Sequence, residues 1–167
     1  MLTGGELAII ALSLKVAATA MAAALPFAFL VAWALARWQF RGRGLLQALP
    51  PLPLVLPPVV TGYALLLLFG GNGPLGWLMR ETVGLEFAFR WTGAALAAAV
   101  MAFPLLVRPI RLSLEAIDPG LEEAAQTLGA GRLRILATVI LPLAFPGILA
   151  GIILGFAKAL GEFGATI

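Results

Sequence analysis

Four stretches of the sequence are long, apolar and almost free of charge, and they constrain the fold more than any other feature. An unpaired charge at the bilayer centre costs about 2.5–3.5 kcal/mol, and a helix needs about 20 apolar residues to cross. Charged residues make up only 11% of the chain. We therefore predict an all-α, multi-pass helical membrane protein, with a single transmembrane domain over residues 1–167. Its four spans are expected at about 7–36, 53–69, 91–107 and 135–160.

Proline and glycine interrupt the second of these stretches. Five prolines fall between positions 50 and 58, and a helix interior tolerates proline poorly. The second span is therefore expected to be entered through an extended or kinked segment. The residues Gly-Gly-Asn-Gly-Pro at 70–74 then predict a turn-rich break.

Basic residues concentrate in alternate loops, and this pattern orients the chain. Cytoplasmic loops of membrane proteins carry an excess of Lys and Arg. The loop after the first span contains Arg37, Arg41 and Arg43, and the loop at 108–134 contains four arginines. The loop at 70–90, on the opposite side, contains two. We expect both basic loops in the cytoplasm, and the N-terminus and the 70–90 loop outside.

The residue inventory argues against an enzyme. The chain has no Cys and no His, which removes thiolate and imidazole metal ligands, cysteine nucleophiles and the usual base of a catalytic triad. We therefore expect no catalytic residues and no metal site. No Gly-x-x-x-x-Gly-Lys-Ser/Thr loop occurs, so we expect no cofactor and no ATP on this chain. A net charge of +3 from a few arginines does not predict nucleic-acid binding.

The segment 117–129, in the second basic loop, has the signals of a short helix. Asp118 suits the N-cap, Pro119 the first turn, and Gly129 the C-terminal position with positive φ. Four apolar residues form one stripe, and Glu122, Glu123 and Gln126 face elsewhere. An interfacial helix on lipid headgroups is the alternative, but such helices usually have basic faces and large apolar residues. We therefore expect a protein partner. The stripe consists of Leu121, Ala124, Ala125 and Leu128.

This segment resembles a signature of the membrane permease subunits of bacterial and archaeal ABC importers. The family pattern is Glu-Ala-Ala, three residues, Gly, nine residues, then Ile-x-Leu-Pro. Here 123–125, Gly129 and 141–142 fall at that spacing, with Val139 in place of Ile. The resemblance implies that the loop 108–134 forms a coupling helix docked on an ATP-hydrolysing subunit. The residues expected to carry coupling are Leu121, Glu122, Glu123, Ala124, Ala125, Leu128, Gly129, Arg132, Leu141 and Pro142.

The same resemblance implies partners and a location. ATP and Mg would be bound by the partner ATPase subunit. An external binding protein would deliver the substrate, and a second copy of the permease would form a homodimer in the lipid bilayer. The location would be the bacterial or archaeal cell (inner) membrane. A secondary transporter or channel is the alternative, but it would leave the 118–129 helix without a purpose.

Further segments resemble the oxyanion permeases, especially the molybdate (tungstate) type. They are residues 52–60, 103–105, 128–132 and 160–167. Sulfate permeases share much of this pattern, so a sulfate or thiosulfate permease is the alternative. Members of the family normally continue to a further span, which this chain is expected to lack.

Two sets of residues inside the spans have candidate roles. Gly147, Gly151 and Gly155 repeat every four positions and predict a face for close helix packing, either within one subunit or across the dimer. A pathway or gate is the functional interpretation of a second set, and kinks made for packing are the alternative for its prolines. That set is Pro57, Pro58, Thr61, Lys158, Gly161, Glu162, Phe163 and Gly164.

Overall fold

The computed structural model describes residues 4–70, 73–83 and 90–164, and every regular element in these ranges is a helix. This confirms the predicted all-α class. The elements are α1 (Gly4–Arg37), α2 (Arg43–Ala48), α3 (Leu52–Val55), α4 (Pro58–Phe69), α5 (Pro74–Val83), α6 (Trp91–Glu115), α7 (Pro119–Thr127), α8 (Arg132–Ile135), the π-helical segment η1 (Leu136–Ile140) and α9 (Leu141–Gly164).

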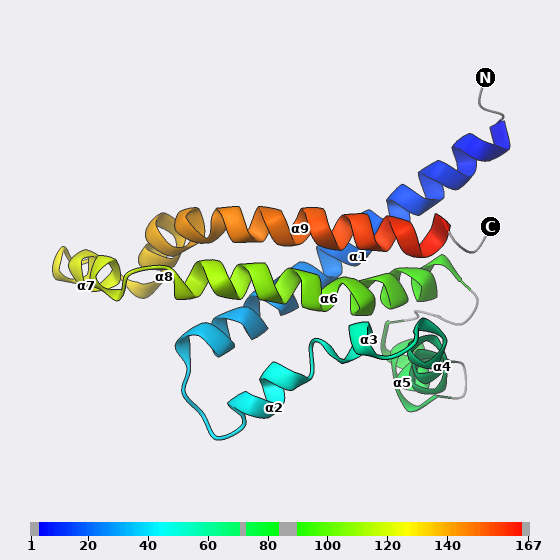
Figure 1. Ribbon diagram of the computed structural model, residues 1–167, viewed down its shortest axis with the longest axis horizontal. Coiled ribbons are helices and arrows are strands. Elements are labelled where there is room, and N and C mark those ends of the chain that lie inside the picture. The colour runs from blue at the N-terminus through cyan, green and yellow to red at the C-terminus, as the bar shows by residue number, and fades with distance from the viewer. Residues whose placement is uncertain (1–3, 71–72, 84–89, 165–167) are drawn as a thin grey trace.

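Among the described residues, three helices are long and apolar enough to cross a membrane. They are α1, α6 and the continuous run from α8 through η1 into α9, which is apolar over Arg132–Gly161. Figure 1 shows α6 and α9 running antiparallel, with α1 crossing them. The short helices α7 and α8 lie at one end of this bundle, whereas α4 and α5 lie near the other.

The segment expected to form the second span differs from a single transmembrane helix. Residues 53–69 are divided between α3 and α4, and the 12 residues of α4 rise only about 18 Å, against an apolar bilayer core of about 30 Å. Leu56 and Pro57 are extended between them, with ψ of 143° and 139°. A residue that precedes proline is disfavoured in the helical region, so two consecutive prolines stop α3 and restart the chain as α4. The sequence predicted the kink but not that it would divide the span.

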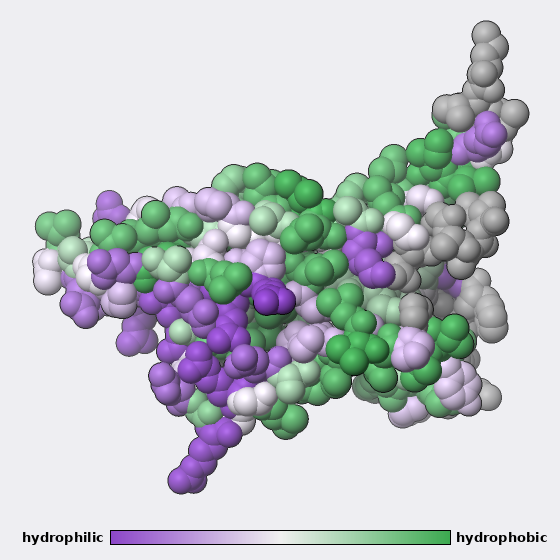
Figure 2. Space-filling model, in the orientation of Figure 1, coloured by the Kyte–Doolittle hydropathy of each residue, from purple (hydrophilic) through white to green (hydrophobic). Residues whose placement is uncertain are grey.

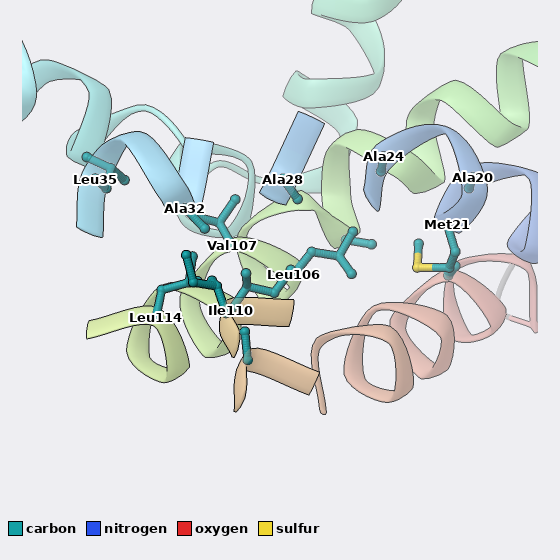
Figure 3. Close-up of a cluster of buried hydrophobic side chains, with 14 of the residues drawn as sticks. Ala20, Met21, Ala24, Ala28, Ala32, Leu35, Leu106, Val107, Ile110 and Leu114 are labelled. Atoms are coloured by element: carbon teal, nitrogen blue, oxygen red, sulfur yellow. The ribbon is translucent and has the colours of Figure 1, made fainter. Parts of the chain in front are cut away.

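The core of the bundle joins small residues of α1 to larger residues of α6. Figure 3 shows Ala20, Ala24, Ala28 and Ala32 along one face of α1, turned towards branched side chains of α6. Because lipid is as apolar as these side chains, close van der Waals packing rather than the hydrophobic effect holds such helices together. Alanine permits that close approach. The fully buried large residues of the core are Val16, Leu35, Leu106, Ile110 and Leu114.

Hydrophilic surface gathers at one end of the bundle. Figure 2 shows it over the side where α1 and α6 end and α7 begins, and apolar surface covers much of the remainder of that view. Exposed large apolar residues lie along all three long helices, for example Leu30, Leu112 and Ile153. An apolar belt with one polar end is the surface expected of a bilayer-embedded bundle.

Candidate coupling site

Helix α7 forms where the sequence predicted it, and its two ends have the predicted chemistry. The Asp118 carboxylate accepts a hydrogen bond from the Gly120 amide at 2.9 Å, and Pro119 is the first helical residue. At the other end Gly129 has φ +81°, and the Ala130 amide donates to the Ala125 carbonyl at 3.0 Å. This reversal closes the helix and returns the chain towards α8.

The faces of α7 differ in part from the predicted stripe. Leu121 is 48% exposed and Leu128 is 88% exposed, so these leucines are turned away from the bundle. Ala125 instead packs against the bundle core. Glu123 is exposed, whereas Glu122 is half-buried. Ala125 is thus the edge of the predicted stripe that lies nearest the bundle, and the sequence did not separate the environments of the two acids.

An ion pair joins α7 to the last residue of α1. Nη2 of Arg37 lies 2.5 Å from Oε1 of Glu122, as an ion pair without the alignment of a hydrogen bond, and both atoms are buried. The Arg37 guanidinium also lies 5.8 Å from the centre of the Trp33 ring, within cation–π range. Sequence reasoning placed both loops on one side of the membrane but missed this contact, because nothing local pairs residues so far apart in the chain.

A second set of charges fastens the same end of α1 to α6. Arg43 donates from Nη2 to the Leu35 carbonyl at 2.8 Å, which satisfies a carbonyl near the end of α1. The same nitrogen lies 3.9 Å from Oε1 of Glu115, and Nε of Arg111 donates to that oxygen at 2.8 Å. The C-terminal ends of α1 and α6 are thus linked through Glu115.

A cavity of about 590 Å³ lies between α1, α7 and the start of the third long helix. Its walls include Trp33 and Trp38 from one side and Leu136 and Ile140 from the other. Arg132 reaches its edge from the first position of α8 and is exposed. The structure therefore places Arg132 at a cavity that Glu122 also lines, but not in the ion pair.

The last two residues of the signature lie just after a π-helical turn. Leu141 and Pro142 begin α9 and are exposed, directly after η1. Proline has no amide hydrogen, so Pro142 cannot donate to the carbonyl four residues before it, and the wider π turn accommodates this loss. The Thr138 hydroxyl donates to the Arg134 carbonyl at 2.7 Å across the same turn. The signature thus joins α7 to an irregular start of the third long helix.

The glycine strip of α9 faces α6 within the same chain, which is the intramolecular one of the two alternatives left open by the sequence. A Cβ at Gly147 would lie 2.5 Å from the Pro109 carbonyl oxygen and would overlap Ser113. A Cβ at Gly151 would lie 3.2 Å from the Leu106 oxygen, and all three glycines are buried. At Gly155 a Cβ would lie 2.9 Å from Sδ of Met21 in α1 and 3.5 Å from Leu106 of α6. The strip is therefore an intramolecular packing face.

The candidate pathway residues are not gathered at one place in the described structure. Pro57 is exposed between α3 and α4, and Pro58 begins α4. Thr61 is buried, and its hydroxyl oxygen has no hydrogen-bond partner. The backbone of α4 packs mainly on α5, whereas α9, which contains Lys158 and Gly161, packs on α6 and α1. Residues 162–164 continue α9, so the helix does not end at Gly161, and the side chains of Glu162 and Phe163 lie outside the described part.

At the far end of the bundle from α7, a cation–π contact ties α1 to α6. Lys15 Nζ lies 4.3 Å from the centre of the Trp91 ring, at the first residue of α6. An ammonium in a largely apolar stretch is costly, and the aromatic face offsets part of that cost. The contact gives Lys15 a packing role that the sequence did not predict.

Comparison with known proteins is consistent with this arrangement. Residues 24–166 match the family described as binding-protein-dependent transport system inner membrane component. The chain is 57% identical over 162 residues to the molybdenum transport system permease protein ModB of Haemophilus influenzae, covering 97% of this chain and 71% of that protein. It is 54% identical over 166 residues to ModB of Escherichia coli K12, covering 99% and 72%. It is 44% identical over 141 residues to the sulfate transport system permease protein CysT of Salmonella typhimurium, covering 84% and 50%.

These matches confirm the predicted resemblance and the prediction of a transport component rather than an enzyme. The family match begins within α1, at residue 24, and takes in α6, α7 and α9. The chain therefore belongs to the family of binding-protein-dependent transport system inner membrane components.

Proposed function

We propose that this chain is the permease subunit of an ATP-driven importer for molybdate, with tungstate as a related substrate. The observation that carries the proposal is the identity of 57% and 54% to two permeases named for molybdenum transport. A sulfate permease is the second candidate, supported by 44% identity over a smaller share of the chain. The higher sequence identity therefore favours molybdate over sulfate as the substrate.

In this proposal α7 is the coupling helix. It exposes Leu121 and Leu128 on one side and Glu123 on another, and in the described structure none of these side chains is buried in the bundle. Leu121 and Leu128 lie seven positions apart, on one side of the helix, and an exposed apolar strip of this kind suits a partner that covers it. That partner is an ATPase subunit, which binds ATP and Mg. Ala124, Gly129, Arg132, Leu141 and Pro142 complete the coupling region.

Closure of the ATPase around ATP would act on the permease through α7. A ligand shifts a conformational equilibrium only as far as it binds the two states differently. Because ATP binds the partner, its effect must cross the α7 contact to bias the spans. An external binding protein would deliver the anion on the opposite side of the membrane. A second copy of the permease would complete the translocation unit.

The proposed orientation places α7 in the cytoplasm and the N-terminus outside. Arginines support it, because Arg37, Arg43 and Arg111 all lie at the α7 end of the bundle. Cytoplasmic loops are enriched in such residues. The pathway or gate would lie nearer the outer end, and a buried Thr61 hydroxyl without a partner supports a polar role there. The other candidates for it are Pro57, Pro58, Lys158, Gly161, Glu162, Phe163 and Gly164.

The test is ATP hydrolysis by the reconstituted complex. The permease, the ATPase subunit and the binding protein would be combined in lipid nanodiscs, and hydrolysis measured with molybdate, tungstate or sulfate. We expect stimulation by molybdate and tungstate at lower anion concentrations than by sulfate. Preferential stimulation by sulfate would overturn the substrate assignment in favour of the second candidate.

Two substitutions test whether the ATPase subunit docks on α7. Glu123→Arg and Gly129→Leu should each abolish co-purification of the ATPase subunit, because one reverses a charge on the outward face and the other blocks the positive φ that ends α7. Glu81→Arg makes the same charge change on α5, an exposed site away from α7, and serves as the control. Retention of the ATPase by both α7 variants would contradict docking at α7.

A further inference from the structure

We propose that Glu122 is a positioning residue in coupling, and that its ion pair with Arg37 is the link through which movement of α7 reaches the transmembrane bundle. This inference rests on the proposed function of α7 as the coupling helix. It adds an assignment within the chain itself. Of the two neighbouring acids, Glu123 faces outward, and Glu122 faces the permease.

The first step is that α7 has few other attachments to the bundle. Its backbone packs mainly against α8, the helix that follows it in the chain. Ala125 of α7 packs against the core, as does Ala130 just after the helix, and both side chains are small. Within the described part of the chain, Arg37–Glu122 is the one ion pair that joins α7 to a spanning helix. A displacement of α7 must therefore pass largely through this pair or through the chain connections.

The second step is that the pair resists separation. The Arg37 and Glu122 side chains are only 19% and 22% exposed, and the paired atoms are buried. Removing one partner from a buried pair leaves an uncompensated charge in a poorly solvated site. Separating the two charges in this setting costs more than moving them together. The ion pair is therefore expected to stay closed when α7 moves.

The third step is that both ends of the link are fixed in orientation. Arg37 lies at the C-terminal end of α1 and Glu122 in the first turn of α7, so each charge complements the dipole of its own helix. Trp33 holds the guanidinium from one side. Arg43, through Leu35 and Glu115, ties the same end of α1 to α6. A force on Glu122 is thereby passed to α1 and on to α6.

The experiment is a charge exchange in the full chain, assembled with its ATPase subunit and binding protein in nanodiscs. Glu122→Arg and Arg37→Glu are made singly and together, and ATP hydrolysis is measured with and without loaded binding protein and molybdate. We expect each single variant to retain the ATPase subunit. The stimulation of ATP hydrolysis should fall at least about fivefold, which is the lower end of typical coupling effects. The double variant restores the opposite charges but sets each against the dipole of its helix, so it should recover part of the stimulation.

Controls separate this inference from the proposed function. Arg41→Glu makes the same charge change in the same loop at an exposed residue, and its stimulation should equal that of the unmodified chain. Glu122→Gln removes the charge without reversing it, and it is the variant to use if a charge reversal prevents folding. It should also reduce the stimulation of ATP hydrolysis. Unchanged stimulation in Glu122→Gln, or no recovery in a folded double variant, would overturn the link. Failure of the unmodified chain to bind the ATPase would instead overturn the proposed function.

Discussion

Replacement of Gly147 by alanine should weaken the contact between α9 and α6. It should not directly change the dimer fraction. The added Cβ would lie 2.5 Å from the Pro109 carbonyl oxygen, whereas ordinary contacts begin at 3.4 Å. That oxygen belongs to the backbone of a buried helix and cannot rotate away. The two helices must therefore separate locally by several tenths of an ångström.

The magnitude follows from two opposing effects. Alanine gains up to about 1 kcal/mol over glycine inside a helix. Overpacking of a well-packed interior typically costs about 1–3 kcal/mol, and a gap of about 0.5–1 Å forfeits a quarter to a half of each neighbouring contact. Because Gly151 and Gly155 share the face, their contacts with Leu106 are loosened too. We expect a net loss of about 2 kcal/mol, which lowers the unfolding midpoint by about 4–8 °C.

The assay is thermal unfolding in detergent, followed by tryptophan fluorescence and by size-exclusion chromatography of the same samples. Gly161→Ala is the matched control, since it lies on the same helix with nothing within 4 Å of its added Cβ. Gly151→Ala should fall between the two, because its closest approach is 3.2 Å. Equal midpoints for Gly147→Ala and Gly161→Ala would refute the intramolecular strip. So would a loss of dimer with no change in the midpoint.

Three further variants test local features. Asp118→Ala removes the acceptor of the Gly120 amide and should destabilise the first turn of α7 by about 1 kcal/mol, seen as about fivefold faster amide hydrogen exchange there. Gly129→Ala places a side chain at φ +81° at a cost of about 1–2 kcal/mol, so α7 should become more protease-sensitive, while Gly131→Ala, at φ −70°, should not change it. Thr61→Val removes a buried hydroxyl that has no partner, so the unfolding midpoint should rise while molybdate uptake falls; a lower midpoint would contradict this account of Thr61.

The features that the sequence predicted well are governed by short stretches of chain. An uncharged run of sufficient length is enough to predict a spanning helix, and the three long helices lie where such runs occur. The two ends of α7 depend on Asp118, Pro119 and Gly129, each of which acts within a few residues of its own position. Local chemistry therefore carried both predictions.

The features that the sequence missed depend on distant parts of the chain or on two adjacent local effects. The face used by Gly147 is defined by Pro109 and Ser113 of another helix, and spacing alone cannot identify that partner. The second span is divided because Leu56 and Pro57 are both extended. The residues on either side of them form the helices α3 and α4. The length and apolarity of residues 53–69 favoured one spanning helix, but the backbone sterics of the two prolines divided it.

The opposite environments of Glu122 and Glu123 show how the coupling end can hold its own helix and still offer it to a partner. Consecutive helical residues are turned by about 100°, so two adjacent acids cannot share one face. Ala125, three residues after Glu122, packs on the bundle and fixes which of them faces inward. Glu122 is then neutralised by Arg37, Glu123 stays exposed, and the exposed Leu121 and Leu128 lie on a different side of the helix. A partner suited to α7 must therefore offer apolar contacts to the leucines and a separate cation to Glu123, and a permease carrying Glu122→Gln should still bind that partner, because neither contact involves Glu122.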